Sequence, residues 1–140
     1  MTCAKPPILK RSVRDFLRAP RVARLATIGA ADGYPHVVPI WFIRDKDDIL
    51  FGCNRADRKV RNLLTNPKGA VVIGGDSKSD EAGYLIRGAL SIEDDRTQVV
   101  LRKILSRYAT KRDIARLLAY WGEEDFVVIR LVPQSVVRVF

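Results

Sequence analysis

A dense group of cationic side chains lies where a strand is expected to give way to a helix. Arg55, Arg58 and Lys59 follow a short apolar run, and Asp57 is a suitable N-cap for a helix over residues 58–65. A helix N-terminus already carries unpaired N–H groups and partial positive charge, so further cations there are unfavourable unless an anion binds. The pattern predicts phosphate binding by backbone and side chains together, with a solvated basic turn as the alternative.

A second group of unusual side chains lies within residues 21–42, which read as two strands joined by a polar turn. Arg24 could reach an anion from the first strand, and the Thr27 hydroxyl can donate or accept a hydrogen bond. Pro39 lacks an N–H, which indicates an edge strand or a break in the ladder, and Trp41 offers a broad apolar face. These residues would suit a flat ring with polar edges, although core packing with a surface Arg gives the same pattern.

Other chemistries find little support in the residue types. The single histidine, His36, follows a proline and has no acidic neighbour, so it is interpreted as an exposed turn residue. Cys3 and Cys53 are far apart and are interpreted as two free thiols. No zinc-ligand spacing, Ser-His-Asp arrangement or phosphate-binding loop motif is present. We therefore predict no metal site and no essential catalytic acid or base among the side chains.

Composition narrows the class of protein. A chain of 140 residues with 47% hydrophobic residues fits one globular domain. The net charge of +9, from 25 basic and 16 acidic residues, favours anionic partners. The aromatic residues lie mostly within apolar runs, so nucleic-acid binding is not expected. No apolar run approaches the ~20 residues of a membrane helix, and the N-terminus lacks a signal-peptide core, which together predict a soluble cytoplasmic protein without a membrane partner.

The predicted organisation is a flexible tail over residues 1–11 and a single domain over residues 12–140. Ser12 and Thr110 are expected to cap helices, Gly88 to mark a bulge, and Pro133 to separate the last two strands. The loop at residues 74–83 is polar and is expected to border a substrate pocket. The predicted strands cover residues 22–28, 36–43, 49–53, 69–73, 84–92, 126–132 and 136–140, and the predicted helices cover 13–17, 58–65, 94 or 95 to 108, and 111–121.

This strand-rich order predicts a mainly β protein with helices in the crossovers (α+β), with about six or seven antiparallel strands and three or four helices. Closing the sheet into a barrel would remove its exposed edges. The segments RLAT, DG, PHVVPIWF and RKVRNLLTNPKGAVVI, followed by a closing FVVIRLVPQSVVRVF, resemble in this order the flavin-binding split-barrel proteins related to pyridoxamine 5'-phosphate oxidase. The resemblance covers roughly residues 14–140, and it is greatest with the small members that include deazaflavin-dependent reductases.

The resemblance implies a split β-barrel homodimer, with two flavin sites at the dimer interface and a small-molecule substrate. It implies that the flavin phosphate is held by basic residues and that the ring lies along the second strand. The cofactor-binding positions that match for the phosphate are Arg24, Arg58 and Lys59, with Arg55 adjacent. Those that match for the ring are Val38, Pro39, Ile40 and Trp41. Thr27 falls where the first strand passes the ring.

One departure from that family concerns the substrate. Pyridoxamine-phosphate oxidases carry a C-terminal Arg-x-His that binds the substrate phosphate, whereas this chain has Arg130, Leu131 and Val132. Oxidation of vitamin B6 is therefore not expected. The implied cofactor is FMN, with the deazaflavin coenzyme F420 as the alternative and haem least favoured. The remaining alternatives are a flavin carrier without turnover, a basic nucleic-acid-binding barrel, and a homodimer whose site has lapsed.

Overall fold

The computed structural model describes residues 8–122 and 124–140, and it contains seven strands and four helices within them. The predicted element count is confirmed. In chain order the elements are α1 (Arg11–Phe16), β1 (Ala23–Ile28), β2 (Pro35–Ile40), β3 (Phe42–Asp45), β4 (Asp48–Asn54), α2 (Arg58–Thr65), β5 (Lys68–Gly74), β6 (Gly83–Asp94), α3 (Val99–Tyr108), α4 (Lys111–Trp121) and β7 (Phe126–Arg138).

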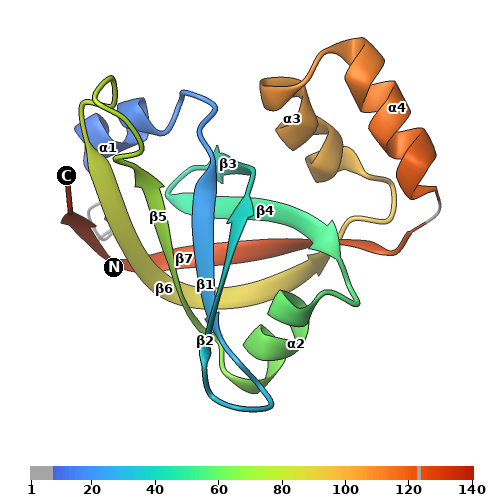
Figure 1. Ribbon diagram of the computed structural model, residues 1–140, viewed down its shortest axis with the longest axis horizontal. Coiled ribbons are helices and arrows are strands. Elements are labelled where there is room, and N and C mark those ends of the chain that lie inside the picture. Colours follow the sequence, from blue (N-terminus) through green and yellow to red (C-terminus); the bar gives the residue numbers. More distant parts are fainter. Residues whose placement is uncertain (1–7, 123) are drawn as a thin grey trace, which may run out of the picture.

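All seven strands form one antiparallel sheet in the order β2-β1-β5-β6-β7-β4-β3, which curls into a half-barrel (Figure 1). Its two edge strands, β2 and β3, are consecutive in the chain and are separated by Trp41 alone. The chain therefore passes from one free edge of the sheet to the other within a single residue. Pro39 lies in an edge strand, as its missing N–H predicted.

The inner face of the half-barrel is filled by large apolar side chains. Along β1 burial alternates with a period of two, which is the pattern of a strand with one covered face. Each such side chain contributes about 1.5–3 kcal/mol when it leaves water. The largest fully buried residues are Leu9, Leu17, Leu25, Phe42, Ile49, Phe51, Ile73, Ile86, Ile104, Leu105, Ile129 and Leu131.

The packed domain begins earlier than the predicted boundary at residue 12. Residues 1–7, including Cys3, lie outside the described part of the chain. Leu9 is fully buried, and its carbonyl accepts a hydrogen bond from Arg14 Nε at 3.0 Å. The first helix accordingly begins at Arg11 after an extended Lys10, so the prediction of a Ser12 cap is wrong.

Three of the predicted strands are divided or joined differently in the structure. The second predicted strand is divided at Trp41 into β2 and β3, because the chain leaves one sheet edge there and joins the other. The two last predicted strands are one continuous strand, β7, which passes through Pro133. Pro133 pairs with Gly88 at a register shift in β6, where the ladder is already irregular and a missing N–H costs little. The predicted bulge at Gly88 is thus confirmed.

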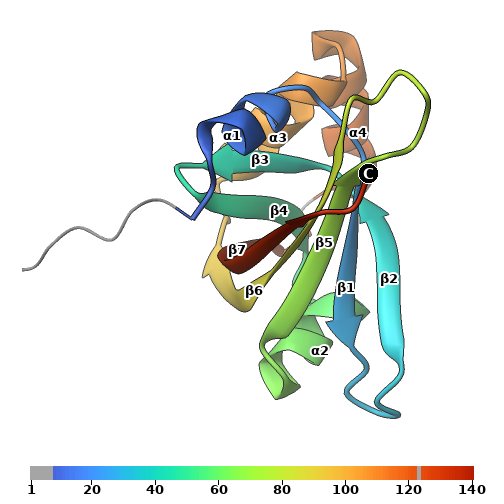
Figure 2. The ribbon, with the colours of Figure 1, turned by 90° about the vertical axis from the view of Figure 1, so that its left-hand side faces the viewer.

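The helices flank the half-barrel at different ends. Figures 1 and 2 show α2 beside the lower end of the β1–β2 hairpin, whereas α3 and α4 lie together near β3. The helix α2 covers the residues predicted, and α4 is capped by Thr110, whose hydroxyl accepts from the Asp113 N–H at 3.2 Å. The helix α3 begins at Val99, later than predicted, and Val99 is 52% exposed rather than inward.

The end of α3 ties the start of β3 to the segment between α1 and β1 through side-chain hydrogen bonds. Arg107 Nη1 donates to the Phe42 carbonyl at 2.5 Å, and its Nη2 donates to the carbonyls of Leu17 and Arg18 at 3.0 Å. The Tyr108 hydroxyl donates to the Arg21 carbonyl at 2.7 Å. These bonds satisfy carbonyl groups of the segment between α1 and β1 and of the first residue of β3. In the described residues no helix is long and apolar enough to cross a membrane.

Candidate functional site

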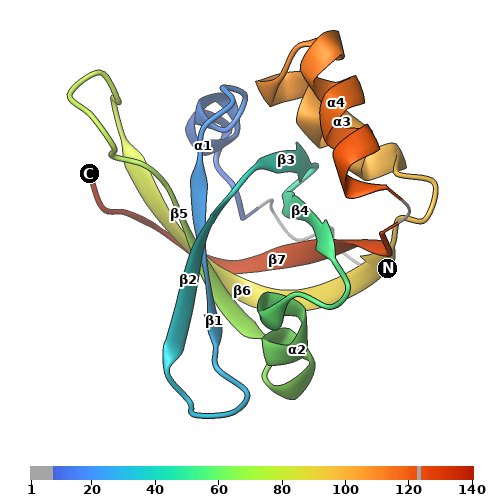
Figure 3. The ribbon, with the colours of Figure 1, turned by 45° about the vertical axis from the view of Figure 1, so that its right-hand side comes forward.

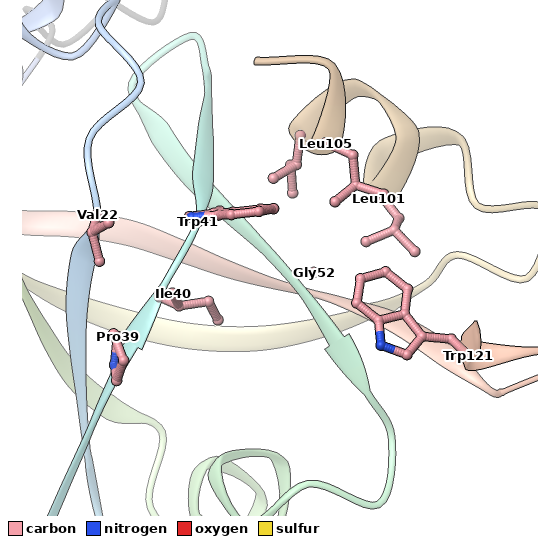
Figure 4. Close-up of a pocket in the computed structure, with 9 residues that line it drawn as sticks. Val22, Pro39, Ile40, Trp41, Gly52, Leu101, Leu105 and Trp121 are labelled. Atoms are coloured by element: carbon pink, nitrogen blue, oxygen red, sulfur yellow. The ribbon is translucent and has the colours of Figure 1, made fainter. Parts of the chain in front are cut away.

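An apolar cavity of about 370 Å³ opens where the chain crosses between the sheet edges (Figure 4). The close-up shows the indole of Trp41 projecting toward α3, with Trp121 lying across from Pro39 and Ile40. Three of the four positions predicted for a flat ring thus share one cavity. The cavity is lined by Val22, Pro39, Ile40, Trp41, Gly52, Leu101, Ile104, Leu105 and Trp121.

The walls of this cavity are fixed by aromatic packing. The Trp41 indole stacks on the Tyr108 ring, with centroids 4.8 Å apart and planes 3° apart. Trp121 packs at a tilt against Phe126, with centroids 5.8 Å apart. Gly52 makes room for α3, because a Cβ there would lie 3.1 Å from Leu101 Cδ1. Both tryptophans of the chain therefore border the cavity.

Val38, the fourth predicted ring position, and Thr27, where the first strand was predicted to pass the ring, lie elsewhere on the hairpin. Val38 pairs with Leu25 and is half-buried on the inner face of the sheet, and it does not line the cavity. Thr27 is 2% exposed, and its hydroxyl accepts from Asn62 Nδ2 at 3.0 Å. The Asn62 Oδ1 in turn accepts from the Ala30 N–H at 2.9 Å. The Thr27 hydroxyl is therefore engaged in joining β1 to α2.

The predicted phosphate-binding cations differ in how they are paired. Lys59 Nζ lies 3.0 Å from Asp57 Oδ2, and its side chain is only 15% exposed. Arg55 pairs with Asp94 and Asp125, and these hydrogen bonds raise the pKa of its guanidinium. Arg58 is exposed, and within residues 8–122 and 124–140 it has no carboxylate partner. An anion would thus find the Arg58 guanidinium unpaired, and it would compete with the Asp57 carboxylate for the Lys59 ammonium group.

Arg24 lies apart from this group. It pairs with Pro39 and Val72 in the sheet register, which places it on the outer face of β1, opposite to Thr27. Arg24 Nη1 is 2.6 Å from Asp76 Oδ1 in the loop that the sequence suggested as a pocket border. The same loop is tied to the start of β1 by Arg21 and Asp80, also at 2.6 Å. It contributes no residue to the apolar cavity.

Cys53 is a buried thiol near the start of α2, where the charge of Lys59 influences it. Cys53 is a free cysteine with 8% exposure, and burial raises its pKa from 9.0 to about 12 while Lys59 lowers it more weakly. The thiol is therefore protonated near neutral pH and is a poor nucleophile. The prediction of a free thiol at this position is confirmed.

Arg130, the one remnant of the Arg-x-His pattern, is fully occupied. Its Nε lies 2.8 Å from Glu93, and its Nη1 lies 3.1 Å from Asp45 and 2.9 Å from Asp48. The hydrogen bond to Glu93 above all raises the pKa of this guanidinium. Three carboxylates around one cation leave no positive charge for a substrate phosphate.

Sequence reasoning missed several residues that build these sites. Gly52, Tyr108 and Trp121 take part in the cavity or its walls, and Asn62 joins the hairpin to α2. An Asn inside an apolar helical stripe was a signal for Asn62, because buried amides need partners. The interpretation of His36 as an exposed turn residue is wrong, since it is half-buried in β2 with its Nδ1 shielded from solvent.

Comparisons with known proteins agree with this architecture. The family model described as pyridoxamine 5'-phosphate oxidase matches residues 9–139. An F420 reductase structure is 25% identical with a TM-score of 0.73, and the match covers 92% of this chain and 98% of that one. The haem storage protein HutZ from Vibrio cholerae (21% identity, TM-score 0.69, 94% and 96% covered) and General Stress Protein 26 from Bacillus anthracis (18%, 0.66, 89% and 88%) share the fold. A search of curated proteins finds no match.

Proposed function

The chain belongs to the pyridoxamine 5'-phosphate oxidase family, and from this premise we propose that it is an FMN-binding oxidoreductase. The observation that carries the proposal is the apolar cavity at Pro39, Ile40 and Trp41. Cofactor sites are typically concave and mostly apolar with few polar groups, and about 300–1,000 Å³ in volume. This cavity has that character, and three of its lining residues, Pro39, Ile40 and Trp41, are ones for which the sequence resemblance implied contact with a ring.

The residues present also suit the phosphate end of the cofactor. Gly52 on the cavity wall and Arg58 belong to one continuous unit, β4 followed by α2. Arg58, Lys59 and the free N–H groups of the α2 N-terminus would hold the phosphate, with Arg55 nearby in its two ion pairs. Arg24 pairs with Pro39 of the cavity lining but lies on the face of β1 opposite to Thr27, and it would approach the phosphate from a second subunit.

When bound, a flavin supplies the hydride-transfer chemistry. The chain's own residues would bind and orient it. Pro39, Ile40 and Trp41 would exclude water from one side of the ring, and the unpaired backbone groups of the free β2 edge would hydrogen-bond its polar rim. No side-chain acid or base is assigned to the reaction, because the cavity lining contains no titratable group.

The deazaflavin coenzyme F420 is the second candidate cofactor. The specific observation in its favour is the 25% identity to an F420 reductase over almost the full length of both chains. Oxidation of a vitamin B6 phosphate is not proposed, because Arg130 is neutralised by Asp45, Asp48 and Glu93. A flavin carrier without turnover would show the same binding but no catalysis with any electron donor.

We propose that the functional unit is a homodimer formed through the outer face of the sheet. That face is apolar where β1 and β2 pair, and Val37 is 57% and Ile28 37% exposed. Pro35 and Pro39 are exposed beside them. Burial of such a face against a second copy would bring the Arg24 of one subunit toward the site of the other.

A titration with FMN, riboflavin and F420 tests the proposed function. The two tryptophans both border the cavity, so quenching of intrinsic fluorescence reports ring binding there. We expect FMN to bind more tightly than riboflavin by about 10–100-fold for each charge-assisted phosphate bond. Sedimentation of the same samples reports the oligomeric state. A protein that binds none of the three molecules would contradict the proposal.

A further inference from the structure

A second cavity, of about 280 Å³, lies at the other end of the hairpin from the apolar one. It is formed between the β1–β2 turn and the exposed side of α2, which lie side by side in Figures 1 and 3. Its character is polar rather than apolar. The lining residues are Gly29, Ala30, Ala31, Asp32, Tyr34, Pro35, His36, Arg58, Arg61 and Asn62.

The charge in this cavity is unbalanced. Arg58 and Arg61 both line it, and in the described part of the chain neither guanidinium pairs with a carboxylate. Asp32 is the one acidic lining residue, and its Oδ1 accepts from the Tyr34 N–H at 3.0 Å within the turn.

A second observation concerns His36 on the cavity wall. Its Nδ1 is shielded from solvent and has no hydrogen-bond partner among the described residues. Unpaired buried polar atoms are uncommon in folded proteins and often mark a place that a water molecule, ion or ligand occupies. His36 pairs with Thr27 in the sheet register, so it lies over the same junction with α2.

The cavity is also preorganised. Asn62 is 2% exposed and holds both Thr27 and the Ala30 N–H, which fixes the turn against the helix. A rigid frame lowers the cost of ordering the site when a ligand binds. Guanidinium groups match phosphate and carboxylate oxygens through paired hydrogen bonds.

We propose that this cavity is an anion-binding site, which takes a phosphate or carboxylate group between Arg61 and Arg58 beside His36. It goes beyond the proposed cofactor site, because the apolar cavity and Lys59 contribute nothing to it and Arg58 alone is shared. The anion is either a second acidic group of a bound F420, since FMN has none beyond its phosphate, or a separate small molecule.

The unique histidine gives a direct test. Its imidazole Hε1 proton is a single resonance in the NMR spectrum, and inorganic phosphate is titrated at constant pH against NaCl of equal ionic strength. We expect a saturable shift with phosphate only. Arg61→Gln should weaken phosphate binding about tenfold or more, Asp32→Asn should strengthen it, and Arg116→Gln on α4 should leave it unchanged.

A shift of equal size in NaCl, or an affinity that Arg61→Gln leaves intact, would overturn the proposal. Neither result would bear on cofactor binding, which tryptophan fluorescence measures separately. To distinguish the two sources, phosphate is titrated in the presence of saturating F420, with saturating FMN as the control, because FMN has no acidic group beyond its phosphate. Competition by F420 but not by FMN identifies a second acidic group of the cofactor, and unchanged phosphate affinity with both identifies a separate ligand. Equal competition by both would show that the cavity is the cofactor's phosphate site and would overturn the proposal of a distinct one.

Discussion

Trp41 lies flat against Tyr108, with ring planes only 3° apart, at the one residue that separates the two free edges of the sheet. The Tyr108 hydroxyl donates to the Arg21 carbonyl at 2.7 Å, so a single side chain from α3 fixes both the tryptophan and the entry to β1. Burial, the largest influence, raises the pKa of this phenol. The orientation of the cavity wall thus depends on a helix more than 60 residues further along the chain.

Removal of the Tyr108 hydroxyl should separate its two roles. Tyr108→Phe keeps the stacked ring but leaves the Arg21 carbonyl without this donor, so the free energy of unfolding should fall by about 1–3 kcal/mol. Tyr108→Leu also removes the stacking, which adds about 0.5–1.5 kcal/mol, and should shift the tryptophan emission to the red. Urea unfolding with fluorescence detection measures both effects. Wild-type stability in Tyr108→Phe would show that the hydrogen bond is unimportant.

The two adjacent cations at the start of α2 should both matter for FMN, but unequally for stability. Arg58→Gln removes an exposed, unpaired charge and should weaken FMN binding about 10–100-fold with little change in stability. Lys59→Gln should weaken binding similarly and also leave Asp57 and the Cys53 region without their cation. Arg112→Gln on α4 is the charge-matched control. Equal FMN affinity in all three variants would refute the phosphate assignment.

Removal of the Asp76 carboxylate, which pairs with Arg24, should show whether this arginine contacts the cofactor. The pair is about 40% exposed on both sides, so Asp76→Asn should change stability by less than about 1 kcal/mol. If Arg24 contacts the phosphate, freeing it should tighten FMN binding several-fold at low salt. Asp113→Asn alters the net charge equally at a distant helix. Indistinguishable affinities in the two variants would remove Arg24 from the site.

The buried contact between Thr27 and Asn62 should behave as one cooperative unit. Thr27→Val leaves an amide donor of Asn62 unpaired, and Asn62→Ala leaves both the Ala30 N–H and the Thr27 hydroxyl unpaired. Each substitution should cost about 1–3 kcal/mol of unfolding free energy. Together they should cost less than the sum, with a coupling of about 0.5–3 kcal/mol in urea denaturation. Strict additivity would mean that the contact contributes nothing to stability.

The buried thiol of Cys53 should make stability depend on alkaline pH. Its pKa is about 12 in the folded state against about 9.0 when unfolded, and below pH 9 both states hold the proton. Between pH 9 and 12 only the folded state keeps it, so this thiol lowers the stability by about 1.4 kcal/mol per pH unit as pH rises. Comparison of the pH profile with that of Cys53→Ala isolates the effect. Parallel profiles for the two proteins would show that burial does not raise the thiol pKa.

Local signals in the sequence predicted those elements whose limits are set by neighbouring residues. Asp57 precedes α2 and Asn66-Pro67 follows it, so its limits were correct to the residue. The split at Trp41 and the continuity of β7 through Pro133 were missed, because both depend on which distant strand lies alongside. Pro133 is tolerated only because it faces the irregularity at Gly88.

In the candidate sites, too, relationships between residues that are adjacent in the chain were easier to predict than those between distant residues. Pro39, Ile40 and Trp41 are adjacent in the chain and line one cavity, whereas their contact with a ring stays a prediction. The opposite wall comes from α3 and Trp121, which no local pattern connects to β2. The ion pairs of Arg24 and Arg55 join residues 39 or more positions apart, so their partners were not predictable from spacing.

The single-residue crossing at Trp41 also limits how the half-barrel can deform. Two virtual Cα–Cα bonds of 3.8 Å join Ile40 to Phe42, so the ends of β2 and β3 cannot separate by more than about 7 Å there. The distant ends of these strands carry no such tether and share no ladder hydrogen bonds. The two strands are therefore held together at Trp41 and can diverge with distance from it, although Asn62 limits this at the β1–β2 turn by holding the turn against α2.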